Sequence, residues 1–493
     1  MAEKYIIGLD IGSQSAKVIM YDLHGNVVCE GKENLRPMYT PTPDIVEHPD
    51  DDLWDALGRA CKNLMANFKG DPTDIIGVGV GSIRCCRVLL KADGTLAAQI
   101  ISWMDPRVSR PYEHENPDVA YVTTTSGYIT HRLTGEFKDN IANYYGQWPV
   151  DYQTWQWSDN DEVIKKFQIP REMLFTAQLP GTILGYITPE AAQKTNLPVG
   201  LPVVGTTSDK AVEGLGAGLI DDTAAVVSLG TYITLMISGD KIPKDPVAYW
   251  AIMASIPHKL IYESYGIRRG MWTVTWFKNL LGEGLIQEAA KNGLSPEEFL
   301  NKEAEKVPPG SDGLMTVLDW LANPWEPFKR GIMIGFNAHM NYAYMYRSIL
   351  EGIAMTMRNN CFNMCEELGK ELKEVIISGG GSNSDLFMQI FADVFNMPAK
   401  RNMVNGSASV GAAINTAIGV GAYDNYEEAV KNMVTVKDTF YPIPENVALY
   451  DALNQGVYRD LTQTTDIVLK KSFDVLQPDE SGKPTITGWT QQT

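Results

Sequence analysis

The sequence predicts an α/β protein made of two similar domains. The chain has 493 residues, which is too long for one hydrophobic core and fits two large domains. Apolar runs of strand length alternate with helical patterns along most of the chain. In addition, the pattern that opens the chain returns near its middle, which indicates an internal repeat.

The opening pattern is a hairpin with an unusually wide turn. Residues 5–22 read YIIGLDIGSQSAKVIMYD, two apolar runs separated by the polar segment from Asp10 to Ser15. A two-residue hairpin turn needs only Asn-Gly or Asp-Gly, so this segment is longer and more polar than a turn requires. It is either a simple wide hairpin or a loop whose polar atoms hold a ligand.

The second copy of this pattern lies in residues 224–240, AAVVSLGTYITLMISGD. Aligning Gly12-Ser13 with Gly230-Thr231 places Asp10 opposite Ser228 and puts each turn near the start of one half of the chain. We therefore expect an N-terminal domain over residues 1–220, a C-terminal domain over 221–445, and a C-terminal helix and tail over 446–493.

The other elements follow from apolar periodicity and turn residues. In the first half we expect a strand pair turned at Gly25-Asn26, a helix over about 50–67, a strand from Asp74, a hairpin turned at Asp93-Gly94 and a buried strand over 201–209. In the second half we expect helices over about 273–281 and 342–367, a strand, glycine turn and helix within 374–396, and helical sequence to about Leu469 before a loosely held tail.

Composition and charge restrict the functional class. Apolar residues make up 44% and charged residues 21% of the chain, as in soluble globular enzymes. The formal net charge of -18 argues against nucleic acid or an anionic membrane as partner, because both require basic surface.

The chain has no signal-peptide pattern and no apolar run of about 18 residues, so we expect a cytoplasmic protein. Its six cysteines match neither a disulfide framework nor a zinc site.

The two glycine turns suggest a phosphate-binding cleft. One turn from each domain could present backbone N–H groups and hydroxyls to a polyphosphate from opposite sides. Asp10 could then hold Mg²⁺ directly or through water, because Mg²⁺ prefers oxygen ligands and keeps several waters. The wide opening turn would in that case be long because it holds phosphates.

A third glycine-rich segment, Ser378 to Asn383, reads SGGGSN between a predicted strand and a predicted helix. Its contiguous glycines differ from the G-x-G-x-x-G fingerprint of dinucleotide-binding proteins. Three glycines let a flat ligand lie close to the backbone, and the following helix adds N–H donors. The segment is either such a binding loop or a plain connection into the helix.

Eight segments occur in one order along the chain: IIGLDIGSQSAK, ISWMDPR, GTTSDKAVEGLGAG, SLGTYIT, NPWEPFKRGIMIGF, YRSILEGIA, SGGGSNSDLFMQIFADVFNMPA and SASVGAAI. This set resembles the FGGY carbohydrate kinases, which include xylulose, ribulose, gluconate and glycerol kinases, over about residues 5–458. The resemblance implies two actin-like, ribonuclease-H-like domains around a central cleft, with ATP held mainly by the second domain and sugar mainly by the first. It implies an ATP-dependent kinase of a small sugar, ketose, polyol or sugar acid.

In the family pattern the acid of the central motif is the general base, and here it falls on Asp209. An acid at the end of a buried strand, bordered by hydroxyl side chains, can accept the proton of an alcohol that attacks the γ-phosphate. Positioning and charge neutralisation supply most of the catalysis in phosphoryl transfer. The alternative for a lone aspartate before a helix is an N-cap.

The resemblance also assigns the other binding positions. Asp10 matches the Mg²⁺-associated acid. The phosphate and nucleoside positions are Gly12, Ser13, Gln14, Gly230, Thr231, Gly380, Gly381 and Asn383. The substrate positions are Arg84, Cys85, Trp103, Asp105, Asp209 and Lys210. Trp103 has the alternative of simple core packing, whereas Arg84 ends an apolar strand and needs a partner.

Two departures from the family pattern bear on the substrate. Ile83-Arg84-Cys85 stands where xylulose kinases have Gln-Met-His, so a pentulose is not assured, and an Arg there resembles the glycerol kinases. Lys210 follows the predicted base where Asn, Gln or Ala is commoner, and a cation there favours ionised Asp209 or pairs with an acidic substrate. Arg84 and Lys210 together suggest an aldonate-like substrate as a hypothesis.

The third departure is a short segment between Arg107 and Gly127, where relatives usually carry a longer wall of the sugar pocket. The pocket is then either more open or completed by a second chain, which would make the protein a homodimer. The contrasting functional hypothesis is a nucleotide-dependent actin-like switch or scaffold with no sugar kinase activity. The altered Ile83-Arg84-Cys85 segment suggests this alternative, whereas Asp209 and the two phosphate turns argue for the kinase.

Overall fold

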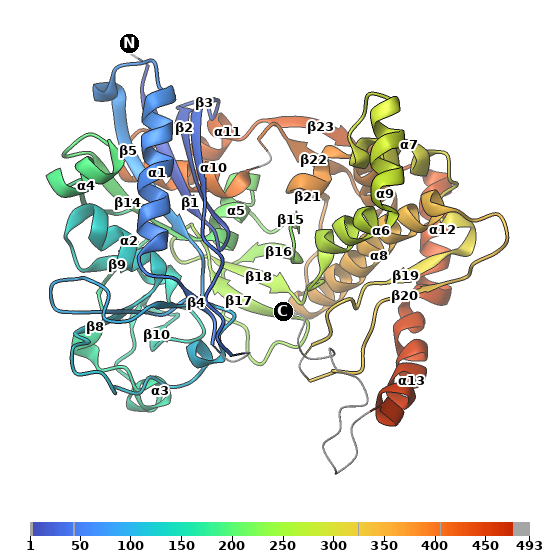
Figure 1. The fold of residues 1–493 in the computed structure, drawn as a ribbon, viewed down its shortest axis with the longest axis horizontal. Coiled ribbons are helices and arrows are strands. Elements are labelled where there is room, and N and C mark those ends of the chain that lie inside the picture. The colour runs from blue at the N-terminus through green and yellow to red at the C-terminus, as the bar shows by residue number, and fades with distance from the viewer. Residues whose placement is uncertain (1–2, 43–44, 324, 405, 477–493) are drawn as a thin grey trace.

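A computed structural model describes residues 3–42, 45–323, 325–404 and 406–476. The chain folds into two lobes, each built around one mixed β-sheet (Figure 1). In Figure 1 the first half of the chain, drawn blue to green, forms most of one lobe, and the second half, drawn light green to red, forms the other lobe and adds orange helices to the first. The predicted α/β class is confirmed.

The first sheet has six strands in the order β13-β14-β5-β1-β2-β3. β1 pairs parallel with β5, and β5 pairs parallel with β14, whereas β2, β3 and β13 run antiparallel to their neighbours. The strands are β1 (Tyr5–Ile11), β2 (Ser15–Asp22), β3 (Val27–Asn34), β5 (Ile75–Ser82), β13 (Ile183–Tyr186) and β14 (Pro202–Ser208).

The second sheet repeats this arrangement and adds one edge strand, in the order β17-β18-β16-β15-β21-β22-β23. β15, β21 and β22 are parallel neighbours, and the other strands run antiparallel to theirs. The strands are β15 (Ala224–Leu229), β16 (Ile233–Gly239), β17 (Tyr249–Met253), β18 (Leu260–Ser264), β21 (Glu374–Ser378), β22 (Ala399–Asn402) and β23 (Val436–Phe440). The repeat inferred from the two hairpins therefore extends to six strands of each sheet.

Helices and short strand pairs complete the two lobes. The helices are α1 (Asp52–Asn67), α2 (Thr125–Thr134), α3 (Asp161–Phe167), α4 (Pro189–Thr195), α5 (Asp209–Ala217), α6 (Gly270–Lys291), α7 (Pro296–Glu305), α8 (Tyr342–Leu368), α9 (Asp385–Phe395), α10 (Ser407–Gly419), α11 (Tyr426–Met433), α12 (Pro444–Leu453) and α13 (Arg459–Leu476). The short pairs are β4 (Glu47–His48) with β7 (Ile100–Ile101), β6 (Val88–Leu90) with β8 (Tyr121–Thr123), β9 (Lys138–Asn140) with β12 (Thr176–Gln178), β10 (Val150–Asp151) with β11 (Gln156–Trp157), and β19 (Met315–Val317) with β20 (Ile332–Ile334).

The predicted elements lie close to where the sequence places them. The helix expected over 273–281 is the first part of α6, whose backbone leaves the helical conformation at Gly282 (φ 61°) before α6 continues to Lys291. The C-terminal helix continues past Leu469 to Leu476. The hairpin turned at Asp93-Gly94 forms, with Leu90 paired to Leu96 and Arg87 to Ile101, and β6 and β7 also pair with β8 and β4. The part of the predicted tail in residues 477–493 lies outside the described residues.

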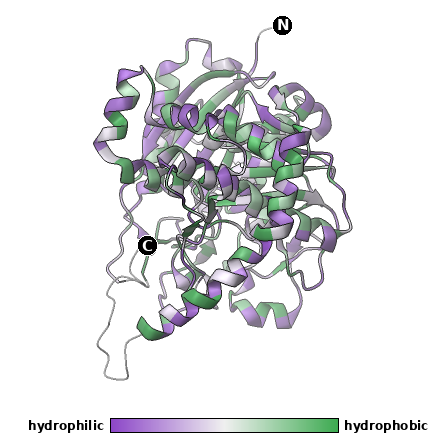
Figure 2. Cartoon of the chain, turned by 90° about the vertical axis from the view of Figure 1, so that its right-hand side faces the viewer, coloured by the Kyte–Doolittle hydropathy of each residue, from purple (hydrophilic) through white to green (hydrophobic). Residues whose placement is uncertain are grey.

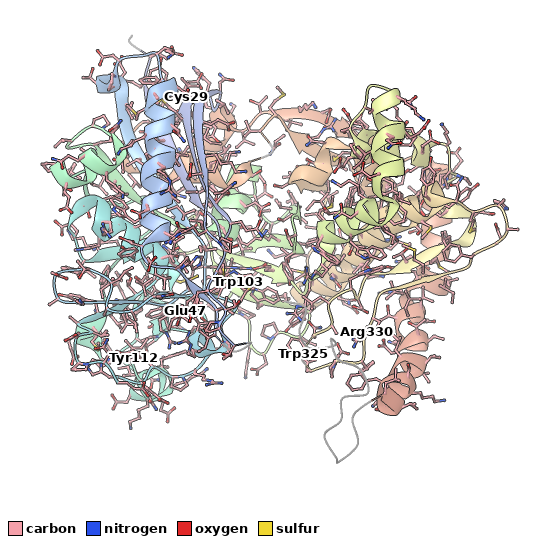
Figure 3. The ribbon with its side chains drawn as sticks, in the orientation of Figure 1. Cys29, Glu47, Trp103, Tyr112, Trp325 and Arg330 are labelled. Carbon is pink, nitrogen blue, oxygen red and sulfur yellow. The ribbon has the colours of Figure 1, made fainter. Side chains whose placement is uncertain are left out.

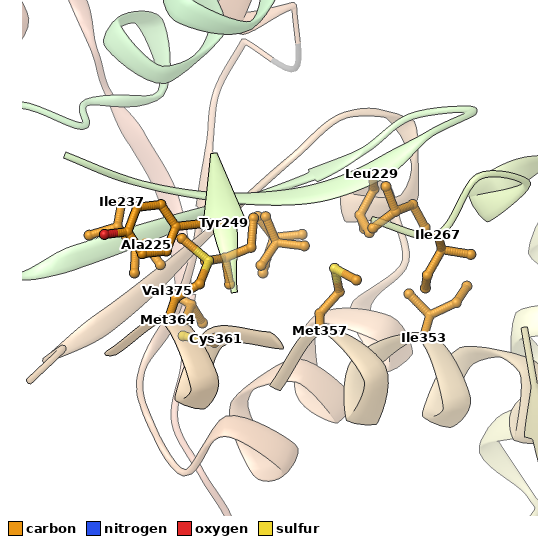
Figure 4. Close-up of a cluster of buried hydrophobic side chains, with 14 of the residues drawn as sticks. Ala225, Leu229, Ile237, Tyr249, Ile267, Ile353, Met357, Cys361, Met364 and Val375 are labelled. Carbon is orange, nitrogen blue, oxygen red and sulfur yellow. The ribbon is translucent and has the colours of Figure 1, made fainter. Parts of the chain in front are cut away.

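The core of the second lobe lies between its sheet and α8 (Figure 4). Ile353, Met357, Cys361 and Met364 recur at helical spacing, so they form one apolar face of α8. Ala225 and Leu229 point from β15 toward that face, because alternate strand residues share one side of the sheet. This packing makes the second sheet a rigid support for the loops at its edge.

Two helices cross between the sheets, and each packs on the sheet of the other half. α10 from the second half contacts β1 and β2 through an apolar cluster, and it lies beside these strands in Figure 1. α5 from the first half packs on the second sheet in the same way. At their crossing, a Cβ on Gly411 would lie 1.9 Å from the Val212 carbonyl oxygen, and one on Gly216 would lie 1.9 Å from that of Ser407. The two backbones are therefore in direct contact.

The helices mix polar and apolar residues along their length, as the alternating purple and green in Figure 2 shows. Among the described residues, no helix is both long enough and apolar enough to cross a membrane. The apolar faces of α8 and α9 are instead buried in the core of the second lobe.

Candidate active site

Three strand ends of the first sheet bring predicted site residues to one edge. In the parallel ladders, Asp10 on β1 lies opposite Gly81 on β5, and Ser82 lies opposite Ser208 on β14. The carboxyl ends of parallel strands meet at the same edge of a sheet, which is where α/β proteins bind ligands. Asp10 and Asp209, the residue after Ser208, therefore lie on one side of the molecule.

Asp209 is the first residue of α5, and Ser208 occupies the N-cap position before it. The Asp209 Oδ1 accepts a hydrogen bond from the backbone N–H of Lys210 at 2.8 Å. The Nε of Arg84 lies 4.0 Å from the same oxygen. The Asp209 side chain is 33% exposed, so the carboxylate is accessible to a ligand from solvent. Because Ser208 occupies the N-cap position, Asp209 is not the N-cap residue itself.

The surroundings of Asp209 change its acidity. Desolvation by the protein raises its pKa above the ordinary value of an aspartate, while Arg84 and Lys210 act in the opposite direction. Glu213 adds to the increase. A carboxylate with a raised pKa is a stronger proton acceptor, and a general base works best when its pKa lies near the working pH.

Arg84 is held by a residue of the second lobe. Its Nη1 and Nη2 donate to Glu263 Oε2 and Oε1 at 2.7 and 3.0 Å, and Nη1 also donates to the Tyr145 hydroxyl at 3.1 Å. Glu263 lies on β18, is 0% exposed and accepts a third hydrogen bond from Trp250 Nε1 at 3.1 Å. The basic residue that the sequence left without a partner is therefore paired across the two lobes.

Lys210 is held in a second junction between the lobes. Its Nζ donates to Glu213 Oε2 at 2.8 Å and to Ser228 Oγ at 2.6 Å. Glu213 on α5 also accepts from Ser228 at 2.9 Å and from Ser378 at 2.9 Å. Ser228 and Ser378 are register partners on β15 and β21. Glu213 thus fixes the start of α5, and with it Asp209, to the edge of the second sheet.

The two glycine turns lie beside these groups. Gly12, Ser13 and Gln14 connect β1 to β2, and the turn closes with a 2.9 Å hydrogen bond from the Gly12 N–H to the Ser15 carbonyl. Gly230 follows β15 two residues after Ser228, whose hydroxyl contacts Lys210 and Glu213. Both turns therefore connect strands whose ends meet around Asp209.

The third glycine segment packs on the second turn. Gly380, Gly381 and Asn383 lie in a short 3₁₀ helix between β21 and α9. A Cβ on Gly381 would lie 2.7 Å from the Leu229 side chain, the residue just before Gly230. The two loops are thus neighbours at the edge of the second sheet.

The remaining predicted substrate residues differ in their surroundings. Cys85 has a backbone φ of 62° in the left-handed region, which costs energy for a residue with a Cβ and is typical of functional sites. Trp103 is 50% exposed and lies between the lobes in the view of Figure 3, so it is not a core residue. Asp105 is buried and accepts hydrogen bonds from Val46 and Arg107. The structure does not bring Asp105 into the group around Asp209, and its sugar contact stays a prediction.

Asp10 carries the second perturbed carboxylate. Desolvation, reinforced by the charge of Asp209, raises its pKa to about 6, while Lys17 on β2 acts in the opposite direction. A carboxylate whose pKa is raised by burial and by a second carboxylate provides a favourable place for a cation. Among the described residues, no group of three or more His, Cys, Asp or Glu side chains is arranged to hold a metal.

The raised pKa of Asp10 predicts a stability effect. Above about pH 6, ionised Asp10 lowers the free energy of unfolding. This destabilisation disappears as the pH falls from about 6 toward 3.8, the ordinary pKa of an aspartate. We expect Asp10→Asn to stabilise the nucleotide-free protein at pH 8 by up to about 3 kcal/mol, because one pKa unit corresponds to about 1.4 kcal/mol. Urea unfolding at pH 8 and pH 4 measures this gain, which should shrink at pH 4. An unchanged or lower stability at pH 8 would contradict it.

A hollow of about 880 Å³ lies elsewhere on the first lobe, away from these strand ends. Its lining includes Asp93, Gln99, His131, Arg132 and Glu190. None of the predicted site residues lines it. We therefore place the candidate active site at the strand ends, where the perturbed carboxylates and the turns converge.

Sequence reasoning missed two residues of the site, Glu213 and Glu263. Glu263 is the single acid in the apolar strand LIYES, and such an acid needs a buried cationic partner just as Arg84 needs an anionic one. Glu213 stands three residues after Lys210 on the predicted helix, a spacing at which side chains meet. Both signals were present, but neither identifies the partner alone.

Comparisons with known proteins identify the family of this chain. The model of the FGGY family of carbohydrate kinases, N-terminal domain, matches residues 5–117 and 111–216, and that of its C-terminal domain matches residues 225–420. The uncharacterized sugar kinase YgcE of Escherichia coli (strain K12) is 65% identical over 490 residues, covering 99% of this chain and 100% of the relative.

Solved structures share the fold. Gluconate kinase from Lactobacillus acidophilus superposes with a TM-score of 0.81 at 19% identity, over 96% of this chain and 100% of that one. Xylulose kinase from Rhodospirillum rubrum gives 0.80 at 22% identity, with the same coverage. The predicted two-domain actin-like fold is confirmed, and the switch or scaffold alternative is not favoured. The chain belongs to the FGGY family of carbohydrate kinases and is an ATP-dependent phosphotransferase that uses an alcohol group as acceptor.

Proposed function

We infer that this kinase transfers the γ-phosphoryl group of ATP to a hydroxyl of a small carbohydrate bound beside Asp209. Asp209 acts as the general base: its carboxylate takes the hydroxyl proton as the alcohol oxygen attacks the γ-phosphorus, and ADP leaves. The observation that carries this assignment is the position of an accessible carboxylate with a raised pKa between the two lobes.

The glycine turns hold the polyphosphate in this proposal. Gly12, Ser13 and Gln14 offer N–H and side-chain donors from the first lobe, and Gly230 and Thr231 offer them from the second. The nucleoside lies along Gly380, Gly381 and Asn383, where glycines allow a flat group to approach the backbone. Packing of Gly381 on Leu229 supports one continuous nucleotide site along the second sheet.

Asp10 is the residue that would hold Mg²⁺. Mg²⁺ is commonly bound by one or two carboxylates, water and substrate phosphates rather than by a full set of protein ligands. Asp10 beside Asp209, with no larger acidic cluster among the described residues, fits this pattern. When bound, Mg²⁺ would neutralise charge on the transferring phosphate.

The sugar lies on the first lobe, near Arg84, Cys85 and Trp103. The Nε of Arg84, 4.0 Å from Asp209 Oδ1, is placed so that one substrate hydroxyl could bridge the two groups. The half-exposed ring of Trp103 could cover a sugar face. Asp105 would act there through Arg107, which it holds by side-chain hydrogen bonds at 2.9 and 2.6 Å.

The short segment before Gly127 would leave this pocket either open or completed by a second chain in a homodimer.

We place the protein in the cytoplasm, since all six cysteines, each within the described part of the chain, are free thiols. We propose no nucleic acid or membrane as partner, because the net charge of -18 repels both.

A substrate panel tests the proposal. We expect ADP release from MgATP to rise by at least about 100-fold when the panel of sugars, ketoses, polyols and sugar acids contains the acceptor, because the bound alcohol is a positioned nucleophile. EDTA should abolish the increase. ADP release that stays constant with every compound would contradict the proposal and favour the switch or scaffold.

A further inference from the structure

The two cations of the cleft already have carboxylate partners. Arg84 and Lys210 were the reason to consider a sugar acid as substrate, because each could bind a carboxylate. In the folded chain Arg84 pairs with Glu263, and Lys210 pairs with Glu213. The sugar acid hypothesis therefore has to be tested against the partners that the fold supplies.

The pairing of Arg84 is specific and buried. Two parallel N–H···O bonds of 2.7 and 3.0 Å join the guanidinium to both oxygens of Glu263, the strongest arrangement available to these groups. Trp250 Nε1 also donates to Glu263 Oε2, so the carboxylate cannot rotate away without losing a third hydrogen bond. A substrate carboxylate would have to displace a partner that is 0% exposed.

The charges that remain around Asp209 also argue against a sugar acid as substrate. After Arg84 and Lys210 are paired, Asp209 remains as the acid near the reacting hydroxyl, because Asp10 is the acid that would hold Mg²⁺. Two like charges about 4 Å apart repel by about 4 kcal/mol at the effective dielectric of a protein surface. A substrate carboxylate beside Asp209 would meet this repulsion, whereas an uncharged hydroxyl would not.

We propose that Glu263 is a specificity-determining residue, which occupies the guanidinium of Arg84 and thereby fits the cleft to an uncharged polyol or sugar and excludes sugar acids. The proposal rests on the proposed function and narrows its substrate class. Arg84 then serves the substrate through its Nε edge near Asp209, which can donate to a hydroxyl. The selecting carboxylate comes from the second lobe, although the sugar site lies on the first.

Matched pairs of substrates test the class on the unaltered protein. Xylitol with xylonate, ribitol with ribonate, and glucitol with gluconate differ by one carboxylate at the chain end. For any pair in which one member is phosphorylated, we expect kcat/KM for the neutral member to be at least about 100-fold higher, given the repulsion between like charges. A preference for the acid would overturn the proposal. If no compound of the wider panel were phosphorylated either, the proposed kinase function itself would fail.

The variant Glu263→Gln tests the residue. Glutamine keeps the size and one hydrogen-bond acceptor but frees the charge of Arg84, so we expect the neutral-to-acid ratio of kcat/KM to fall at least about 10-fold, mainly through a lower KM for the acid. Glu351→Gln is the matched control, because Glu351 is also a buried partner of an arginine in the second lobe, Arg347. Its ratio should stay at the wild-type value.

Two outcomes would contradict the role of Glu263. An unchanged ratio in a folded Glu263→Gln protein would show that the carboxylate only supports the structure. An equal change in the Glu351→Gln protein would show a general effect of losing a buried charge. Circular dichroism establishes folding, and if Glu263→Gln does not fold, the matched pairs on the unaltered protein still decide the substrate class.

Discussion

Asp209→Asn is expected to lower kcat by about 10²- to 10⁴-fold, the usual contribution of a positioned general base. Asparagine keeps the oxygen that accepts the Lys210 N–H at 2.8 Å, so the start of α5 should remain in place. It loses the ability to take a proton. The reason for the loss is therefore chemical, and a steady-state assay of ADP release with the identified acceptor measures it.

The control for this variant is Asp161→Asn. Asp161 is likewise the first residue of a helix, α3, and its N-cap residue Asn160 precedes it as Ser208 precedes Asp209. Asp161→Asn should keep wild-type kcat. Turnover close to the wild-type level in a folded Asp209→Asn protein would remove Asp209 as the base and leave it a structural role at the helix start.

Gly411→Ala should have the largest effect on stability. Its Cβ would lie 1.9 Å from the Val212 carbonyl oxygen and 3.0 Å from the Gly216 nitrogen, so α5 and α10 would have to move apart. Overpacking of this kind costs about 1–3 kcal/mol and more when rigid backbone is involved. Because Asp209 begins α5, the shift would also misplace the base, and a displacement of about 1 Å can cost about 10²-fold in rate.

Thermal unfolding and kcat measure these two effects, with Gly284→Ala as the matched control. Gly284 lies in α6 two residues after the break at Gly282, and no atom outside its own helix lies within 4 Å of the position of its added Cβ. That substitution should leave activity unchanged and be neutral or slightly stabilising, because alanine favours helix more than glycine by about 1 kcal/mol. Equal behaviour of the two variants would show that the helix crossing tolerates a methyl group.

Much of the site could be predicted from local sequence. The wide turn after Asp10, its copy at Gly230 and the acid after a buried strand at Asp209 are each visible in about ten residues of chain. The strand ladders then carry these ends to one edge, as the parallel pairing of β1, β5 and β14 requires. The hypothesis of a positively charged sugar pocket rested on Arg84 and Lys210. Their carboxylate partners, Glu263 and Glu213, depend on packing and could not be predicted from local sequence.

Residues close in the chain were enough to predict the α/β class, the duplicated sheets and the positions of the turns, because strand alternation and turn chemistry are local properties. The pairing of Arg84 with Glu263, 179 residues further along, and the packing of α10 on the sheet of the first half depend on the complete fold and could not be predicted in this way. Burial is the physical reason for such pairs. A charge removed from water requires a partner of opposite charge, and an apolar face is stabilised by packing against another apolar face.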